Sequence, residues 1–275
     1  MQQLQGFFNI DGVSLEYRLF QPRQATDPTL VFLHEGLGCV AMWKDFPLQV
    51  ARLTGCRVLV YSRAGYGRSD SCPLPRPLSF MHDEGLRVLP KVLTAAEIER
   101  AVLVGHSDGA SIALIHAGGC ADPRLRGLIL MAPHVFVEDL TLAGIRAARA
   151  AWQTTDLRDK LHRYHGDNVD CAFLGWNRAW LDPDFADWNL ENYLPAINIP
   201  VLLIQGEQDD YGTIRQLEKI VAQLPQQTKT VMLPACGHSP FRDKPTETLQ
   251  LVSEFLQQHF LSAAANPSQP DVPSR

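Results

Sequence analysis

The sequence predicts an α/β fold in which a mostly parallel central sheet is covered by helices on both faces. Three observations lead to this prediction. Compact apolar runs rich in Val, Leu and Ile recur along the chain, segments of helical length lie between them, and one long interval, 131–200, interrupts the alternation. Such runs suit strands buried on both faces, and regular alternation of strand and helix is typical of a doubly wound sheet.

The predicted strands form two groups. The first is a hairpin made of the β-type runs 7–10 and 14–20, which are separated by the turn signal Asp11-Gly12. The second is a set of buried strands that we expect to be parallel, followed by a short β-type run at 230–233. The buried strands lie at 29–33, 57–61, 101–104, 125–131 and 200–204.

Helices are expected between these strands, and an insertion is expected above the sheet. The interval 131–200 is longer than one crossover needs, and it carries four tryptophans together with helical patterning near 139–164. Long excursions over the carboxyl edge of a sheet are where lids are built. We therefore expect a core of 1–133 and 196–261 and a helical cap at 134–195. The core helices are expected at about 42–54, 79–97, 109–120, 213–224 and 245–261.

Composition argues against several classes of protein. With 45% hydrophobic and 20% charged residues, the 275-residue chain has ample material for a core and no sign of collagen or coiled coil. Its net charge of −5 is spread along the sequence, which argues against a nucleic-acid surface. Six cysteines are scattered singly, so neither a zinc site nor a disulfide framework is indicated.

The ends of the chain and its hydropathy predict a location. The N-terminus lacks the basic and apolar regions of a signal peptide, and no stretch approaches the length of a membrane span. We therefore expect a cytoplasmic protein that binds no membrane and acts on a small molecule, with its oligomeric state left open. Residues 262–275 are small, polar and proline-rich, which favours a disordered tail.

Ser107 is the candidate nucleophile. It lies in Gly105-His106-Ser107-Asp108-Gly109, directly after the predicted strand 101–104 and before a predicted helix. Glycines on both sides let strand and helix approach closely, so that the serine can hold a strained conformation with its hydroxyl exposed. The pattern Gly-x-Ser-x-Gly is weak alone, but here it falls at the strand-to-helix junction that a nucleophile elbow requires.

A serine hydroxyl needs a base, and the base needs an orienting carboxylate. His238 follows the β-type run 230–233 and precedes the last helix, which puts it at the same sheet edge as Ser107. Asp209 and Asp210 follow the strand 200–204. We favour Asp209 as the acid because it ends a Gly-x-x-Asp turn after the strand, while Asp210 stays open. His106 is expected to pack within the elbow.

The remaining candidates are oxyanion donors and substrate contacts. The backbone N–H of Asp108 is one expected donor, and the loop after strand 29–33 should supply the other from Gly36 or Leu37. We expect the substrate to be lined by His34 and Glu35 of that loop and by Trp176 or Trp180 of the cap.

These residues resemble the α/β-hydrolase superfamily, in particular serine esterase-like members with a helical cap. The matches are His34-Glu35-Gly36-Leu37-Gly38 to the oxyanion loop, 62–69 to the loop that usually reads Asp-x-x-Gly-x-Gly-x-Ser, the Ser107 elbow, and the acid and base. The chain departs from the family at Glu35, where glycine is common, and at Ser62, where aspartate is usual. The resemblance implies the α/β-hydrolase fold over about 10–261, a Ser-His-Asp triad and no metal or organic cofactor.

The resemblance implies a chemistry but does not select the substrate. Our first hypothesis is hydrolysis of a carboxylic ester or lactone through an acyl-enzyme. The alternatives are an amidase or a C–C bond hydrolase with the same triad, and a non-catalytic small-molecule receptor of the same fold.

Asp108 is also similar to the acid of valacyclovir hydrolase-like enzymes that helps to recognise an amino group. With Glu35 it could select an amine-bearing substrate such as an aminoacyl ester or a macrocyclic lactone. We favour the alternative that Asp108 serves local turn amides and that Glu35 pairs with an arginine such as Arg63.

Overall fold

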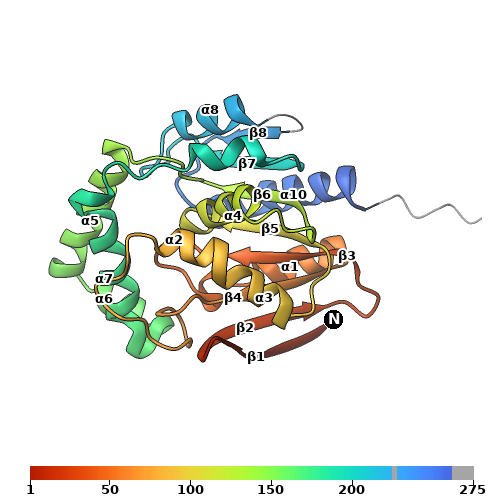
Figure 1. Ribbon diagram of the computed structural model, residues 1–275, viewed down its shortest axis with the longest axis horizontal. Helices are drawn as coiled ribbons and strands as arrows, with labels where there is room; N and C mark the ends of the chain where they lie inside the picture. Colours follow the sequence, from red (N-terminus) through yellow and green to blue (C-terminus); the bar gives the residue numbers. More distant parts are fainter. Residues whose placement is uncertain (225–227, 262–275) are drawn as a thin grey trace, which may run out of the picture.

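The computed structural model describes residues 1–224 and 228–261, and within these ranges it contains an eight-stranded sheet (Figure 1). The strand order is β1-β2-β4-β3-β5-β6-β7-β8, in which only β2 runs against its neighbours. The mostly parallel sheet that the apolar runs predict is therefore confirmed. The strands are β1 (Gln2–Ile10), β2 (Val13–Gln21), β3 (Thr26–Leu33), β4 (Cys56–Tyr61), β5 (Ala101–His106), β6 (Leu125–Met131), β7 (Val201–Gly206) and β8 (Thr228–Leu233).

Helices cover both faces of the sheet. Side chains of a strand alternate between the two faces, so Val31 and Leu33 of β3 enter one apolar core while Leu30 and Phe32 enter the other. The first core is closed by α3 (Leu89–Ala95), α4 (Asp108–Gly119) and α8 (Ile214–Gln223). The second is closed by α1 (Phe46–Thr54), α9 (Pro240–Asp243) and α10 (Pro245–His259).

The helix predicted at 79–97 is interrupted. It consists of α2 (Phe80–Asp83), a π-turn at Glu84–Val88, and α3. Pro90 has no N–H to donate to the carbonyl of Leu86, so the α-helical ladder cannot run through this point. The helix predicted at 42–54 likewise divides, into a 3₁₀ turn at Val40–Trp43 and α1.

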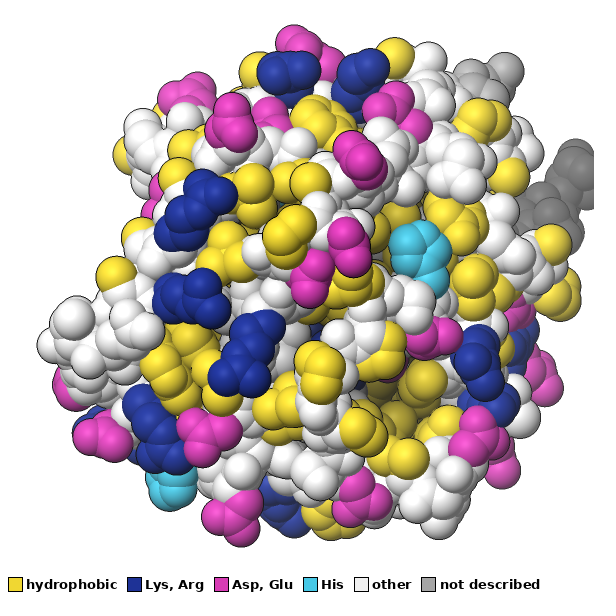
Figure 2. Space-filling model, turned by 60° about the vertical axis from the view of Figure 1, so that its left-hand side comes forward, with side chains coloured by type: hydrophobic (Ala, Val, Ile, Leu, Met, Phe, Trp, Pro, Cys, Tyr) yellow, Lys and Arg dark blue, Asp and Glu magenta, His cyan; other side chains and the backbone are white. Residues whose placement is uncertain are grey.

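The segment between β6 and β7 is mainly helical. It contains α5 (Asp139–Thr154), α6 (Leu157–His165) and α7 (Val169–Trp180), which stand together beside the carboxyl edge of the sheet (Figure 1). The helical patterning predicted near 139–164 covers the first two helices but not α7. Acidic and basic side chains lie among apolar ones on this side of the molecule (Figure 2). A short 3₁₀ turn at Gly166–Asn168 joins α6 to α7, and two more follow α7 at Pro183–Phe185 and Glu191–Ala196.

Helix α7 carries much of the apolar contact of this segment. Its Phe173 ring stacks on Trp152 of α5 with the ring centroids 4.0 Å apart. Trp180 packs edge-on against Phe185 and Trp188, at centroid distances of 5.1 and 5.4 Å. The tryptophans therefore build a small core of the segment as well as facing the sheet edge.

Two further predictions concern the C-terminal tail and membrane-spanning segments. The disordered tail expected at 262–275 lies outside the described residues. Among the helices of 1–224 and 228–261, none combines the length and the hydropathy that crossing a membrane requires.

Candidate active site

Ser107 lies at a strained junction between β5 and α4. Its φ of +52° and ψ of −120° fall in a region that residues other than glycine rarely adopt, at a cost on the order of 1–3 kcal/mol. The neighbouring backbones leave no room for side chains. A Cβ at Gly109 would lie 2.0 Å from the Leu33 carbonyl oxygen, and one at Gly105 would lie 2.5 Å from the Gly109 carbonyl oxygen. The close packing of strand and helix thus requires both glycines.

The structure brings His238 and Asp209 together. Nδ1 of His238 lies 2.8 Å from Oδ1 of Asp209, and the Asp209 side chain is 1% exposed. The same oxygen accepts hydrogen bonds from the backbone N–H groups of Tyr211 and Gly212, at 2.8 and 3.2 Å. Because Nδ1 donates to Asp209, Nε2 is left as the basic nitrogen of the ring. Asp210 is exposed to solvent.

The Asp209 carboxylate is held in its charged form. Burial alone would raise its pKa, but the hydrogen bond and charge of His238 and the Tyr211 N–H outweigh burial and lower it. An ionised, buried acid is suited to fix the tautomer of His238 and to stabilise its protonated ring.

The expected oxyanion loop lies against the elbow and against the tryptophans of α7. Gly109 of the elbow touches the carbonyls of Leu33 and His34, which brings the first amides of α4 beside the loop. A Cβ at Gly36 would lie 2.2 Å from Nε1 of Trp176, so the indole lies directly over this glycine. The N–H of Asp108 opens α4, where the first amides have no partner within the helix.

His34 is buried in the loop and corrects our expectation of a substrate contact. Its ring is 0% exposed, and its Nδ1 lies 2.7 Å from the Glu35 carbonyl while its Nε2 accepts from the Arg63 N–H at 3.1 Å. Burial first, and then the positive charge of Arg63, lower its pKa well below the usual range. Both ring nitrogens are therefore occupied by backbone groups, and His34 holds the loop in place.

Glu35 points behind the elbow, which differs from the expected position beside the substrate. Its carboxylate lies 3.5 Å from Nδ1 of His106 and 3.9 Å from Nη2 of Arg242. Arg63, the expected partner, donates instead to the backbone carbonyl of Glu35 at 3.1 Å. Burial would raise the pKa of Glu35, but the nearby His106, helped by Arg242, outweighs burial and lowers it.

His106 links this carboxylate to the base. Its Nε2 lies 2.7 Å from the carbonyl oxygen of His238, so the ring bridges Glu35 and the backbone of the loop that carries the base. The rings of Trp43 and Phe241 pack around it, at centroid distances of 6.3 and 5.4 Å. Sequence reasoning predicted a packing role for His106 but missed its contact with His238.

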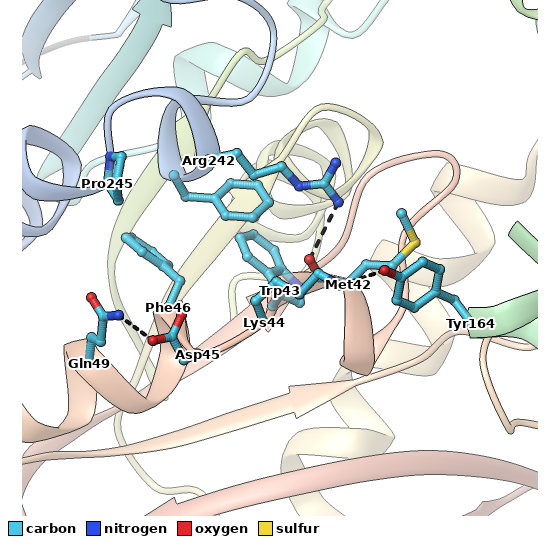
Figure 3. Close-up of a pocket in the computed structure, with 10 residues that line it drawn as sticks. Met42, Trp43, Lys44, Asp45, Phe46, Gln49, Tyr164, Arg242 and Pro245 are labelled. Carbon is cyan, nitrogen blue, oxygen red and sulfur yellow. Dashed lines mark hydrogen bonds between the residues drawn. The ribbon is translucent and has the colours of Figure 1, made fainter. Parts of the chain in front are cut away.

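A pocket of about 510 Å³ opens on this rear side of the elbow (Figure 3). Its lining includes neither Ser107 nor His238, and the guanidinium of Arg242 reaches across it to the Met42 carbonyl, 3.4 Å away. The pocket is therefore separate from the candidate active site. It is lined by Met42, Trp43, Lys44, Asp45, Phe46, Gln49, Tyr164, Phe241, Arg242 and Pro245.

The Asp108 side chain makes a contact that the sequence did not indicate. It is 1% exposed, and Oδ1 accepts a hydrogen bond from Nε1 of Trp180 at 3.2 Å, not from local turn amides. Within 1–224 and 228–261, its Oδ2 is buried without a hydrogen-bond partner. Burial raises the pKa of this carboxyl, while Arg63 and Trp180 oppose the increase.

His134 is a site residue that sequence reasoning missed. It follows β6 at the same sheet edge as His238. The centroid of its ring lies 5.7 Å from the ring centroid of His238 and 5.6 Å from that of Trp180. Burial, and then the charge of His238, lower its pKa to about 3. The sequence did offer one signal for His134, because it follows a predicted buried strand, as the other site residues do. Tyr211, 4.7 Å from His238 between ring centroids, was also missed.

The strand order, the strained serine and the Asp209–His238 pair together match the architecture of α/β hydrolases. A sequence model described as "Alpha/beta hydrolase family" matches residues 30–251. The chain therefore belongs to this family, and the superfamily that its motifs indicated is confirmed.

Curated relatives differ in their named activities. The proline iminopeptidase of Lactobacillus helveticus is 23% identical over 296 residues, which cover 94% of this chain and 99% of the relative. A putative non-heme chloroperoxidase of Synechocystis sp. is 26% identical and covers 85% of this chain and 98% of its own.

Solved structures show the same fold. Proline iminopeptidase of Mycobacterium smegmatis aligns with a TM-score of 0.70 at 22% identity, over 93% of this chain and 98% of that one. The enol-lactonase from Burkholderia xenovorans aligns with a TM-score of 0.69 at 19% identity, over 91% and 99%. At these identities the likeness shows the fold alone.

The two aspartates provide a test of the site. Asp209→Asn should lower kcat/KM for a p-nitrophenyl ester by about 10²–10⁴-fold, because the amide cannot stabilise a protonated His238. Asp210→Asn, in the adjacent exposed residue, is the matched control and should stay within about twofold of wild type. The opposite ranking would show that Asp210 orients the base.

His134 provides a pH-dependent test. Its folded pKa of about 3 lies below the ordinary 6.5, so below pH 6.5 the unfolded chain binds a proton that the folded chain does not. Stability should therefore fall as the pH falls, by roughly 2 kcal/mol between pH 6.5 and 5 from this group. In urea unfolding experiments, the free energy of unfolding of His134→Asn should therefore fall by roughly 2 kcal/mol less than that of wild type between pH 6.5 and 5. The exposed His162→Asn should leave the dependence unchanged, and equal slopes in all three proteins would contradict the assignment.

Proposed function

We propose that the protein is a serine hydrolase that cleaves a carboxylic ester or lactone through an acyl-enzyme on Ser107. The observation that carries the proposal is the 2.8 Å hydrogen bond between Asp209 and His238 at the sheet edge where Ser107 holds its strained conformation. A nucleophile, a base and an orienting acid in this order along the chain are typical of hydrolases with this fold.

In this mechanism, Ser107 Oγ attacks the substrate carbonyl while His238 takes its proton. Asp209 stabilises the protonated imidazole, and the backbone N–H groups of Asp108 and of Gly36 or Leu37 donate to the oxyanion. His238 then gives the proton to the leaving oxygen, and the acyl group remains on Ser107. Water, activated by His238, releases the acid and restores the serine.

Amide hydrolysis is the second candidate. The support for it is that several curated relatives carry the name proline iminopeptidase. An amine leaving group must be protonated before it departs, so this reaction depends more strongly on the position of His238 than ester cleavage does. The triad would be the same.

We infer that residues 134–195 act as a cap over this site. Helix α7 supports the inference, because Trp176 covers Gly36 of the oxyanion loop and Trp180 bonds to Asp108 beside the nucleophile. A substrate that reaches Ser107 would therefore pass these two indoles, and the shape of their surroundings would set the accepted acyl group.

We also propose that the substrate carries a cationic amine near the scissile carbonyl. The buried Oδ2 of Asp108 lacks a hydrogen-bond partner in the described part of the chain, and leaving such an oxygen unsatisfied is costly. An ammonium group would supply the missing donor and compensate the buried charge. Glu35 no longer supports this idea, because its carboxylate lies on the other side of the elbow with His106 and Arg242.

The covalent step can be tested by mass spectrometry. A slowly hydrolysed ester should add one acyl group to the wild-type protein, on the peptide that contains Ser107. Ser107→Ala should form no adduct and should lose at least about 10³-fold in turnover while keeping its circular dichroism spectrum. Ser71→Ala, in an exposed serine, is the matched control. Binding of esters without turnover or adduct would favour a receptor instead.

Amine recognition can be tested with paired substrates. Wild type should favour prolyl p-nitrophenyl ester over its des-amino cyclopentanecarbonyl analogue, and Asp108→Asn should lose about tenfold or more of that preference in kcat/KM. Asparagine keeps an acceptor for Trp180, which limits structural damage. Equal handling of both esters by wild type would remove the proposal. Prolyl p-nitroanilide, measured alongside, separates amide from ester cleavage.

A further inference from the structure

Two cysteines lie in contact where helix α7 meets the core. Sγ of Cys72, in the loop after β4, lies 2.8 Å from Sγ of Cys171 on α7, although the two are 99 residues apart in sequence. The Cys171 thiol also lies 3.3 Å from the Cys72 carbonyl oxygen. The six cysteines are free thiols in this structure. A disulfide has an S–S distance of about 2.05 Å, so the bond would need an approach of less than about 1 Å.

A buried guanidinium lies beside the pair. Nη2 of Arg76 is 3.3 Å from Sγ of Cys72, and Nη1 donates to the Tyr66 hydroxyl at 2.6 Å. The hydrogen bond between the two thiols, together with Arg76, lowers the pKa at which the pair loses its first proton, although burial opposes this, and raises the pKa for loss of the second. A cation and a thiol donor beside a sulfur favour the thiolate, which is the reactive form.

Small molecules can approach these sulfurs from one side. Cys72 lines an open pocket of about 290 Å³ together with Arg63, Ala64, Arg76 and Phe80, and its side chain is partly exposed. Cys171 lies behind it and is nearly buried. The pocket is large enough for a peroxide.

We propose that Cys72 and Cys171 form an oxidation site, in which a peroxide converts the two thiols into a disulfide that ties α7 to the loop after β4. The inference goes beyond the proposed hydrolysis and uses none of its residues. It assigns a modification to two side chains that the triad chemistry does not require.

The reaction balances with one molecule of peroxide. The thiolate of Cys72, the sulfur that lines the pocket and contacts Arg76, attacks a peroxide oxygen; the O–O bond breaks, and a sulfenic acid and hydroxide form. The Cys171 thiol, 2.8 Å away, then attacks the sulfenic sulfur of Cys72; the S–S bond forms, the S–O bond breaks, and the hydroxyl leaves with the Cys171 proton as water. The two thiols lose two electrons, which reduce the peroxide to water, and a dithiol reductant reverses the change.

The bond would fix the helix that borders the candidate active site. Cys171 and Trp176 lie on α7, and Trp176 rests on Gly36 of the expected oxyanion loop. Gly175, also on α7, faces Arg76 so closely that a Cβ there would lie 2.9 Å from its Nε. A covalent tie at this contact therefore restricts the opening of α7 away from the core.

The test is peroxide treatment of the full chain followed by peptide mapping without reduction. Low-millimolar hydrogen peroxide should lower the intact mass by 2 Da, as expected for one disulfide, and should yield a peptide that links Cys72 to Cys171. Dithiothreitol should restore the original mass. Cys72→Ser and Cys171→Ser should each abolish the linked peptide. Cys120→Ser is the matched control, because Cys120 is partly exposed and its thiol lies beside the backbone carbonyls of Gly85 and Leu86, away from the Cys72–Cys171 pair.

Hydrogen exchange tests the tether itself. In the oxidised protein, amides of α7 should exchange about tenfold more slowly than in the reduced protein, while those of α10, remote from the pair, should not change. Oxidation that leaves both thiols open to alkylation, or that joins other cysteines, would overturn the proposal. A Cys72–Cys171 disulfide with unchanged exchange in α7 would overturn its role as a tether.

Discussion

The close approach of the elbow to β3 is the constraint on which the site depends. Gly109 lies so near the Leu33 carbonyl that a Cβ would overlap it at 2.0 Å, and this contact brings the start of α4 against the loop after β3. The amide of Asp108 opens α4 at this contact, and Gly36 and Leu37 follow His34 in the loop that Gly109 approaches. The strained φ of Ser107 follows from the same turn, since the chain must reverse from β5 into α4 within one residue.

The elbow separates two environments. On one side, Asp108 meets Trp180 of α7, and His134 lies near His238. On the other side, His106 bridges the Glu35 carboxylate and the His238 carbonyl. Glu35 therefore joins the oxyanion loop to the loop of the base through a single ring. A glycine at this position, as is common in the family, would leave His106 without its acidic neighbour, so the departure has a structural use.

Most of the fold could be predicted because buried parallel strands have a strong signature. The runs at 29–33, 57–61 and 125–131 lie within β3, β4 and β6. Helix α7 lies in the segment predicted to be a helical cap but was not predicted as a separate helix. Its sequence did carry the signal, because the buried Phe173, Trp176 and Trp180 recur at spacings of three and four residues. The interruption at 84–88 had a signal in the sequence, because Pro90 lies in the interior of the helix predicted at 79–97 and an interior proline breaks the α-helical ladder; the prediction did not use it.

The direction of a side chain was the least predictable property of the site. The spacing after β7 favoured Asp209, and in the structure its carboxylate contacts His238. Asp209 turns its oxygens toward the loop that carries His238, while the neighbouring Asp210 faces solvent. Spacing could not show that Glu35 turns backward or that His34 is closed off by Arg63, since both depend on partners distant in sequence. The same holds for the contacts of α7 with Gly36, Asp108 and Cys72, which arise only after the segment folds onto the sheet edge. The motifs that identify the family therefore predict the elbow and the Asp209–His238 pair, while the surroundings of the elbow are determined by contacts between the inserted helices and the core.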